Sequence, residues 1–378
     1  MAIEHLQPGN LVPKPPEPRP ESEIMAGWKG DRNKPLVSIL CITYNHAPYI
    51  ADALNGFLIQ ETDFPFEIIV HDDASADETQ RIIEQYQQRY PNLITTVFQT
   101  ENQYSKGSRP TQFVKDLCRG IYSALCEGDD YWLSPDKLSK QVFLLETNKD
   151  VHLSVHPAYL FDVSKGKFAP KFEHDLVSGS VLPVSDAVSA SSQFAPTASY
   201  FFRTKEFLSM PEWFFNAQDL PFGDYFIEAL LGRHGIIYAH DIFSVYRRNV
   251  PGSYTHRTAQ SSDNYLISRI GSVLRYTSKL EDYECISSIS IQKRKVNIVK
   301  DYQGMALARR SLYLYRAVSA EGERYAVRNA VVENIAMKSE VSFRCYRFYR
   351  FLKATSSKLK SFIWMLKKRF SRSPNFSG

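Results

Sequence analysis

Apolar runs alternate with amphipathic stretches and polar loops along the N-terminal third of the chain. Three short runs rich in β-branched residues, at 36–42, 66–70 and 94–98, predict buried strands. Helical patterns fill the spaces between them, from about 47 to 60 and then up to about Arg89. Strands separated by helices of this length predict βαβ units with a parallel sheet, so the expected fold class is α/β.

Three carboxylates within four residues follow a fourth apolar run, at 121–126. They are Glu127, Asp129 and Asp130. Acidic side chains at the end of a buried strand are costly unless something neutralises them. Their oxygen atoms suit Mg²⁺ or Mn²⁺ better than Zn²⁺. The pattern therefore predicts a site for a divalent cation, with a solvated turn as the alternative.

Polar residues also follow the first two predicted strands. Thr43, Tyr44 and Asn45 come after the first strand, and Asp72 and Asp73 come after the second. Ligands of parallel sheets bind at the carboxyl ends of the strands. We therefore expect these residues and the acidic cluster to converge on one edge of the sheet, although they lie far apart in the sequence.

The order and spacing of three segments resemble the family 2 glycosyltransferases of the GT-A fold. The segments read VSILCITYN at 37–45, HDDASADET at 71–79 and CEGDDYWLSPDKL at 126–138. The resemblance covers residues 35 to 254. It implies a nucleotide-diphosphate sugar as donor, a divalent metal ion as cofactor, and inversion at the anomeric carbon of the sugar.

The resemblance also implies roles for the residues after the first two strands. Thr43, Tyr44 and Asn45 would cradle the donor base, with packing as the alternative for the Tyr44 ring. Asp73, with Asp72 beside it, would accept hydrogen bonds from the nucleoside, since an ionised carboxylate only accepts. The alternative for both aspartates is a favourable contact with the start of the next helix.

Glu127, Gly128 and Asp129 occupy the place of the Asp-x-Asp triplet of this family. The resemblance makes Asp129 the first ligand of Mn²⁺ or Mg²⁺ and Asp130 the second. Glu127 replaces the first aspartate with a side chain one methylene longer, so we expect it to contact the donor ribose or a metal-bound water. Gly128 would let the backbone approach the phosphates.

An inverting transferase needs a general base for the acceptor hydroxyl. Asp224 begins a helical pattern and corresponds to the second acid of the acidic pair in this family, with Gly223 in place of the first. The alternative for Asp224 is a role as helix cap. Glu228, one turn later, is the second candidate for the base, and Asp219 is the third.

A basic pair follows the β-rich run at 236–243. Relatives of this family carry Tyr-Arg-x-His there, whereas this chain has Asn249 at the histidine position. A histidine–metal contact is therefore not expected at Asn249. Arg247, or Arg248 beside it, would bind the donor diphosphate, and His256 could replace the missing histidine. The alternative for these basic residues is a solvated surface.

Composition bounds the remaining possibilities. The 378 residues, 43% of them hydrophobic, suit one extended α/β domain with an appendage. We expect a flexible proline-rich tail at 1–34, a catalytic domain at 35–257, a helical region at 258–340 and a basic tail at 341–378. Five cysteines without a Cys-x-x-Cys pair, and the lack of a signal peptide or a long apolar span, predict a cytoplasmic protein.

Positive charge is concentrated at the C-terminal end. Residues 341–378 hold ten Lys and Arg and no acid, whereas the net charge of the whole chain is +5. An apolar stripe at helical spacing runs through the same segment, formed by Leu359, Phe362, Ile363, Leu366 and Phe370. A basic amphipathic helix predicts binding to an anionic membrane surface at the inner face of the cell membrane. The alternative is a helix that packs on its own domain.

These observations together predict a metal-dependent, inverting glycosyltransferase that acts on a glycan or lipid-linked acceptor in surface polysaccharide assembly. UDP is the expected nucleotide. A nucleotidyltransferase of the same fold is the first alternative, but residues 43–49 lack the glycine- and Arg/Lys-rich loop that such enzymes need. A non-catalytic protein that binds lipid or nucleic acid through the tail is the second. No nucleic-acid-binding motif is present, so nucleic acid is not an expected partner.

Overall fold

The computed structural model describes residues 13–253, 257–258, 260–325 and 343–344. The chain divides into two compact units. Unit 1 comprises the residues up to Ser261 together with Tyr276–Arg294, and unit 2 comprises Ser262–Arg275 and the residues from Lys295 onward. The predicted catalytic region lies in unit 1.

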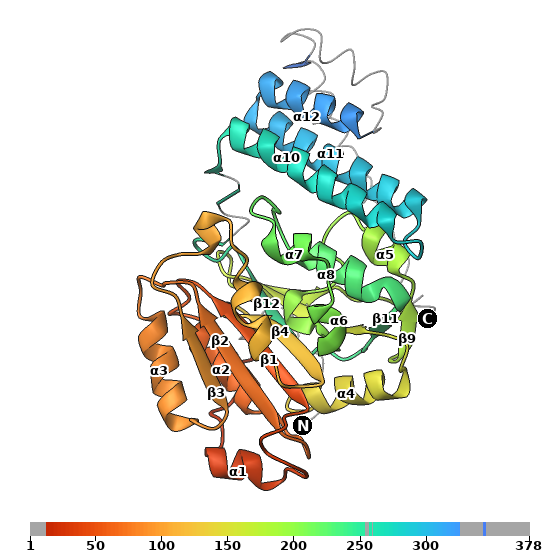
Figure 1. Ribbon diagram of the computed structural model, residues 1–378. Helices are drawn as coiled ribbons and strands as arrows, with labels where there is room; N and C mark the ends of the chain where they lie inside the picture. The colour runs from red at the N-terminus through yellow and green to blue at the C-terminus, as the bar shows by residue number, and fades with distance from the viewer. Residues whose placement is uncertain (1–12, 254–256, 259, 326–342, 345–378) are drawn as a thin grey trace, which may run out of the picture. The chain divides into compact units, whose positions relative to one another are not determined.

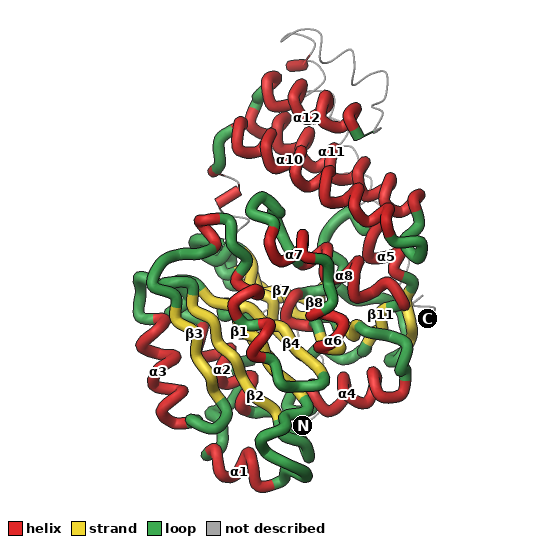
Figure 2. The backbone as a smooth tube through the Cα atoms, in the orientation of Figure 1, coloured by secondary structure: helices red, strands yellow, loops and turns green. Residues whose placement is uncertain are grey.

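An eight-stranded sheet forms the centre of unit 1, in the order β3-β2-β1-β4-β10-β6-β11-β9. Its first four strands are mutually parallel, as the sequence predicts, and they lie side by side in Figure 2. Strands β10 and β9 run antiparallel to their neighbours, so the second half of the sheet is mixed. The bounds are β1 Val37–Thr43, β2 Phe66–Asp72, β3 Ile94–Phe98, β4 Tyr122–Glu127, β6 Leu153–Val155, β9 Ser180–Leu182, β10 Phe201–Arg203 and β11 Ile236–Tyr238.

Helices cover both faces of this sheet (Figure 1). Ile39 and Cys41 of β1 belong to a core cluster shared with α2, α3 and α4, whereas Leu40 belongs to the cluster shared with α5 to α8. A strand that is buried on both faces reads as a continuous apolar run, which explains the sequence pattern. The helices of unit 1 outside the N-terminal segment are α2 Ile50–Leu58, α3 Thr79–Arg89, α4 Lys137–Thr147, α5 Val184–Ser189, α6 Thr204–Leu208, α7 Glu212–Asn216 and α8 Asp224–Leu231.

A second sheet of four strands, in the order β5-β12-β7-β8, stands beside the first. Strand β5 is Tyr131–Trp132, directly after the acidic cluster, and it pairs with β12, Ser244–Arg248. The other two strands are β7 Ala158–Asp162, which pairs with β12, and β8 Lys167–Lys171 at the edge. This pairing brings the predicted basic pair to the acidic cluster across a long stretch of sequence.

The N-terminal segment differs from the flexible tail that its prolines predict. Among residues 13–34, Ile24 of α1 (Glu21–Ala26) is buried, and the Trp28 ring lies 5.3 Å from that of Phe66. The backbone carbonyl of Pro13 accepts a hydrogen bond of 2.9 Å from the Tyr131 hydroxyl. Prolines restrict the backbone to extended conformations, and this extended segment is held by side-chain contacts with the α/β unit.

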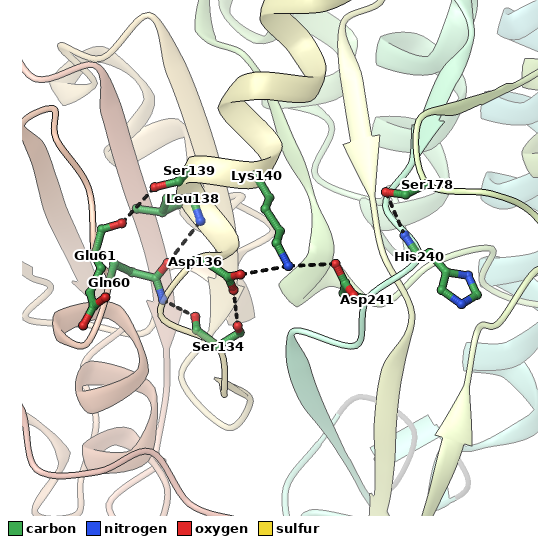
Figure 3. A network of polar contacts seen from close by, with 10 residues as sticks. All are labelled: Gln60, Glu61, Ser134, Asp136, Leu138, Ser139, Lys140, Ser178, His240 and Asp241. Atoms are coloured by element: carbon green, nitrogen blue, oxygen red, sulfur yellow. Dashed lines mark hydrogen bonds and ion pairs between the residues drawn. The ribbon is translucent and has the colours of Figure 1, made fainter. Parts of the chain in front are cut away.

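Helix α4, which follows the acidic cluster, is fixed at its start by a polar network (Figure 3). The Gln60 side chain accepts a hydrogen bond of 3.1 Å from the backbone N–H of Leu138. The Lys140 ammonium lies 2.8 Å from Asp136 and 2.9 Å from Asp241. These contacts tie α4 to the end of α2 and to the loop before β12, which also holds the segment between β4 and α4 in place.

Unit 2 is helical, and the predicted helical extension is confirmed. It contains most of α10 (Asp263–Ser278) and α11 (Ser288–Arg309), and all of α12 (Leu312–Arg324). The Ser311 hydroxyl caps α12 and donates a hydrogen bond of 2.6 Å to Asp263 at the start of α10. Within the described part of the chain, no helix combines the length and the apolar character needed to cross a bilayer. The predicted basic helix and His256 lie outside the described residues.

Candidate functional site

The carboxyl ends of the parallel strands meet at one edge, as predicted. Thr43 at the end of β1 is the register partner of Asp72 on β2, and Ile42 is the partner of Glu127 on β4. A cavity of about 500 Å³ opens at this edge. Of the predicted site residues, the cavity is lined by Thr43, Tyr44, Asp73, Glu127, Asp129, Asp224 and Arg247. Asn45, Asp72 and Asp130 stand behind its wall.

The end of β1 forms one wall of the cavity. The Thr43 side chain is buried, and its hydroxyl has no hydrogen-bond partner in the described structure. A Cβ atom on Gly128 would lie 2.6 Å from the Thr43 Oγ1 atom, which is too close for any side chain. Gly128 therefore lets the acidic loop pack against β1. Tyr44, in contrast, is exposed beside the cavity.

Asn45 and Asp72 join the two loops that follow β1 and β2. Asn45 adopts a positive φ of 55°, and its side-chain oxygen accepts a hydrogen bond of 2.8 Å from the Ala76 N–H. The Asp72 carboxylate accepts hydrogen bonds from the Ser75 N–H, at 2.9 Å, and from the Gln80 amide, at 2.6 Å. Both side chains thus hold the loops in shape from outside the cavity.

Asp73 lies in the cavity wall and also holds a loop. Its two carboxylate oxygens accept hydrogen bonds from the backbone N–H groups of Gln103, at 2.8 Å, and Tyr104, at 3.0 Å. Each carboxylate oxygen can accept a further hydrogen bond. Asn102 and Tyr104 line the cavity as well. Asp73 can therefore anchor this loop and accept a hydrogen bond from a ligand at the same time.

Glu127 and Asp129 form an acidic wall. The Glu127 side chain opens into the cavity, and removal from bulk water together with the charges of Asp129 and Asp224 raises its pKa above the ordinary value. The Asp129 carboxylate lies 3.8 Å from the His46 Nε2 atom. Within the described residues, no group of three or more His, Cys, Asp or Glu side chains is placed to hold a metal ion by itself. The pair suits Mg²⁺ or Mn²⁺, which commonly takes one or two carboxylates and completes its shell with water and substrate phosphates.

Asp130 lies behind this wall and contacts Arg247, a mostly buried residue of the cavity lining. The backbone N–H of Arg247 donates a hydrogen bond of 2.8 Å to the Asp130 carboxylate. The Arg247 guanidinium donates to the Asp129 carbonyl, at 2.8 Å, and to the Asp52 carboxylate, and it lies 4.4 Å from the centre of the Tyr131 ring. Burial and the Asp129 charge raise the pKa of Asp130. This arrangement makes the Arg247 guanidinium a support for the acidic loop.

Asp224 is the first residue of α8 and lines the same cavity, although it lies far from β1 and β2 in the sequence. Its carboxylate accepts a hydrogen bond of 2.8 Å from the Tyr225 N–H. Burial raises the pKa of Asp224, and the positive charges of Arg294 and Arg109 oppose this rise. The charge of Asp224 interacts with that of Glu127, so the predicted base lies near the acidic wall.

The two other candidates for the base differ in position. Glu228 is fully buried and also lines the cavity, and its Oε1 atom accepts hydrogen bonds from the Tyr200 hydroxyl, at 2.7 Å, and the Ala195 N–H, at 3.0 Å. Burial and the charge of Asp224 raise the pKa of Glu228 to about 8. Asp219 is exposed, accepts a hydrogen bond from Tyr276 and does not line the cavity.

Several residues of the site have no counterpart in the sequence analysis. His46 directly follows the first polar loop, so its position beside Asp129 could have been considered. Tyr246 of β12 also lines the cavity, on the same side of the strand as the predicted Arg248. Arg109 and Arg294 come from segments without a recognisable motif, and only the fold brings them to the cavity.

The sequence matches one family model and several curated proteins. The model of the family described as "Glycosyl transferase family 2" matches residues 38–250. An uncharacterised protein of Mycobacterium tuberculosis is 46% identical over 121 residues, which cover 32% of this chain and 34% of that protein. An uncharacterised glycosyltransferase of Methanocaldococcus jannaschii is 33% identical over 135 residues, or 35% of this chain and 45% of that protein. The matches therefore span less than half of these relatives.

Among solved structures, that of residues 1–349 of Staphylococcus aureus TarS in complex with UDP-GlcNAc resembles this chain with a TM-score of 0.48 and 13% sequence identity. The alignment covers 82% of this chain and 91% of the TarS chain.

Proposed function

This chain belongs to glycosyl transferase family 2, whose members use nucleotide-sugar donors, and we propose that it transfers a sugar from a UDP-sugar to a hydroxyl of a glycan or lipid-linked acceptor. The transfer inverts the anomeric carbon and depends on Mn²⁺ or Mg²⁺. One observation carries the proposal. Asp73, Asp129 and Asp224, from three distant parts of the sequence, line one cavity at the carboxyl edge of a parallel sheet.

Different residues of the cavity lining bind different parts of the donor. In the proposal, Thr43, Tyr44 and Asp73 hold the nucleoside. Asp129 and Glu127 hold the metal ion, which when bound supplies positive charge to the leaving diphosphate. Arg248 binds the diphosphate through its positive charge. Its side chain lines the cavity and has no ion-pair partner among the described residues.

Asp224 serves as the general base in this proposal. It lines the cavity within electrostatic range of Glu127, and a base must reach the acceptor hydroxyl next to the donor. Burial makes its carboxylate more basic than in water, which favours proton removal from a hydroxyl. The backbone hydrogen bond from Tyr225 occupies one oxygen and leaves the other for the acceptor.

The experiment is a panel of nucleotide sugars tested for slow hydrolysis with Mn²⁺ and with EDTA. We expect one nucleotide class to be hydrolysed only with Mn²⁺, and Asp129→Asn to lower the rate by roughly 10²-fold or more, since it removes charge stabilisation of the leaving group. Asp116→Asn, an exposed aspartate outside the cavity, is the matched control. Equal rates in EDTA, or an Asp129→Asn rate equal to that of the control, would refute the proposal.

A further inference from the structure

A buried arginine stands beside the proposed base. Arg294 is 8% exposed and lines the cavity. Its Nη1 atom donates a hydrogen bond of 2.7 Å to the Ala190 carbonyl, and its guanidinium lies 4.5 Å from the centre of the Tyr225 ring. These two contacts fix the plane of the guanidinium. The Nε atom is buried and has no hydrogen-bond partner in the described structure.

The positive charge of Arg294 is not matched by an ion pair. None of the ion pairs among the described residues includes Arg294, although its charge acts on both Asp224 and Glu228. A buried charge without a paired, hydrogen-bonded partner is costly. A guanidinium with an unpaired donor suits charge-assisted hydrogen bonds to a carboxylate or a phosphate. Because Arg294 lines the cavity, an anion bound there would supply the missing negative charge.

The position of Arg294 separates this anion from the donor diphosphate. The diphosphate, in the proposed function, lies between Asp129 and Arg248, at the ends of β4 and β12. Arg294 instead packs on Tyr225 and Ala190, on the side of α8. Arg109 approaches the same helix at Gly223, where a Cβ atom would lie 2.5 Å from its Nη1 atom. Positive side chains thus flank the start of α8, where the acceptor must lie.

We propose that the acceptor carries a negatively charged group, a phosphate or a carboxylate, next to the hydroxyl that receives the sugar, and that Arg294 binds this group. The inference rests on the proposed function, because it takes Asp224 as the base that faces the acceptor. It narrows the acceptor to anionic glycans or polyol phosphates.

The test measures binding of matched pairs of small molecules to the full chain saturated with UDP and Mn²⁺. Methyl glucuronide is compared with methyl glucoside, and ribitol 5-phosphate with ribitol, by calorimetry. We expect at least one anion to bind roughly tenfold or more tighter than its neutral partner, as a charge-assisted hydrogen bond allows. The two pairs distinguish a carboxylate from a phosphate.

Variants then identify the residue. Arg294→Gln should remove the preference for the anion and leave UDP affinity unchanged, and Arg294→Lys should keep part of the preference. Arg32→Gln, at an exposed site outside the cavity, should behave like the wild type. Equal binding of charged and neutral partners, absence of binding by either anion, or loss of UDP affinity in Arg294→Gln would overturn the proposal. A wild-type chain that binds no nucleotide diphosphate with Mn²⁺ would instead overturn the proposed function.

Discussion

Arg247 and Arg248 show how the direction of a side chain decides its role. Successive residues of a strand point to opposite faces. Arg247 points inward to Asp52 and to the Asp129 carbonyl, whereas Arg248 is exposed beside the cavity. The sequence suggested that either arginine could bind phosphate, and the strand geometry now favours Arg248. The two positions form a natural pair for mutation.

We predict that the two glutamine variants affect different properties, stability in one and UDP binding in the other. Among the described residues, Arg247→Gln leaves the buried Asp52 with only the exposed Lys14 as ion-pair partner, so stability should fall by roughly 3–5 kcal/mol. Arg248→Gln should leave stability unchanged and weaken UDP binding, because it removes an exposed cation near the diphosphate. Urea unfolding and UDP titration of both proteins provide the measurements. A stable Arg247→Gln protein with weakened UDP binding would restore Arg247 as the phosphate ligand.

A second pair of variants separates the two candidate bases. Asp224→Asn should lower donor hydrolysis by roughly 10²–10⁴-fold without loss of UDP affinity, because it removes only the basic group. Glu228 has a pKa of about 8 and is mostly protonated at neutral pH. Glu228→Gln replaces a neutral acid with a neutral amide and should change the rate little. If Glu228→Gln were the inactive variant and Asp224→Asn the active one, Asp224 would be only a helix cap.

At the scale of elements, the first half of the fold followed from the sequence. The predicted strands at 36–42, 66–70 and 94–98 correspond to β1, β2 and β3, because strands buried on both faces leave continuous apolar runs. Strands β6, β9 and β10 have only three residues each, too few to form a pattern. The segment before β4 forms only 3-10 turns, such as Pro110–Phe113 and Lys115–Leu117, which are also too short to form a pattern.

Helix α4 contains a buried lysine that makes stability depend on pH. The Lys137 side chain is fully buried, its ammonium lies 3.9 Å from the centre of the Trp132 ring, and it donates to Gln141 at 2.6 Å. Burial lowers the pKa of Lys137 to about 7, from the 10.5 of a free lysine. Between these values the unfolded chain holds the proton that the folded chain has released. The free energy of unfolding therefore rises with pH in this window and falls as pH drops toward 7.

We predict that Lys137→Met raises the free energy of unfolding above that of the wild type, and that this gain is larger at about pH 7 than at about pH 9.5. The difference should shrink by about 1.4 kcal/mol per pH unit at most, as linkage requires. Urea unfolding at both pH values measures it. Lys140→Met, which removes an exposed lysine of the same helix, should show no such change with pH. A constant difference between Lys137→Met and the wild type would mean that Lys137 stays protonated in the folded protein.

For the whole molecule, the sequence predicted where the candidate site lies but not all the residues that complete it. Asp73 and Asp129 follow strands with clear patterns and Asp224 begins a helix with one, so their convergence could be expected. Arg294 reaches the same cavity from helix α11, and Arg247 binds Asp52 across 195 residues of sequence. Such long-range partners leave no local pattern, and only the complete fold brings them together.

The strongest feature of the whole chain outside unit 1 is the charge of its C-terminal end. Residues 341–378 carry ten Lys and Arg and no acid, while the remainder of the chain is net negative. The structure describes only Phe343 and Arg344 of this segment, so its apolar stripe stays a prediction. A basic segment of this kind favours anionic membranes by about 1 kcal/mol for each residue near the surface, and salt weakens that attraction.

We predict that the full chain sediments with vesicles containing phosphatidylglycerol at low salt and is released at high salt. A chain truncated after Glu340 should remain unbound under both conditions. The truncated chain should still hydrolyse the nucleotide sugar, because all residues that line the cavity precede Met305. This retained activity separates loss of membrane binding from loss of folding. Equal sedimentation of the two chains would mean that the basic segment does not bind the membrane, and that its apolar stripe packs against the protein.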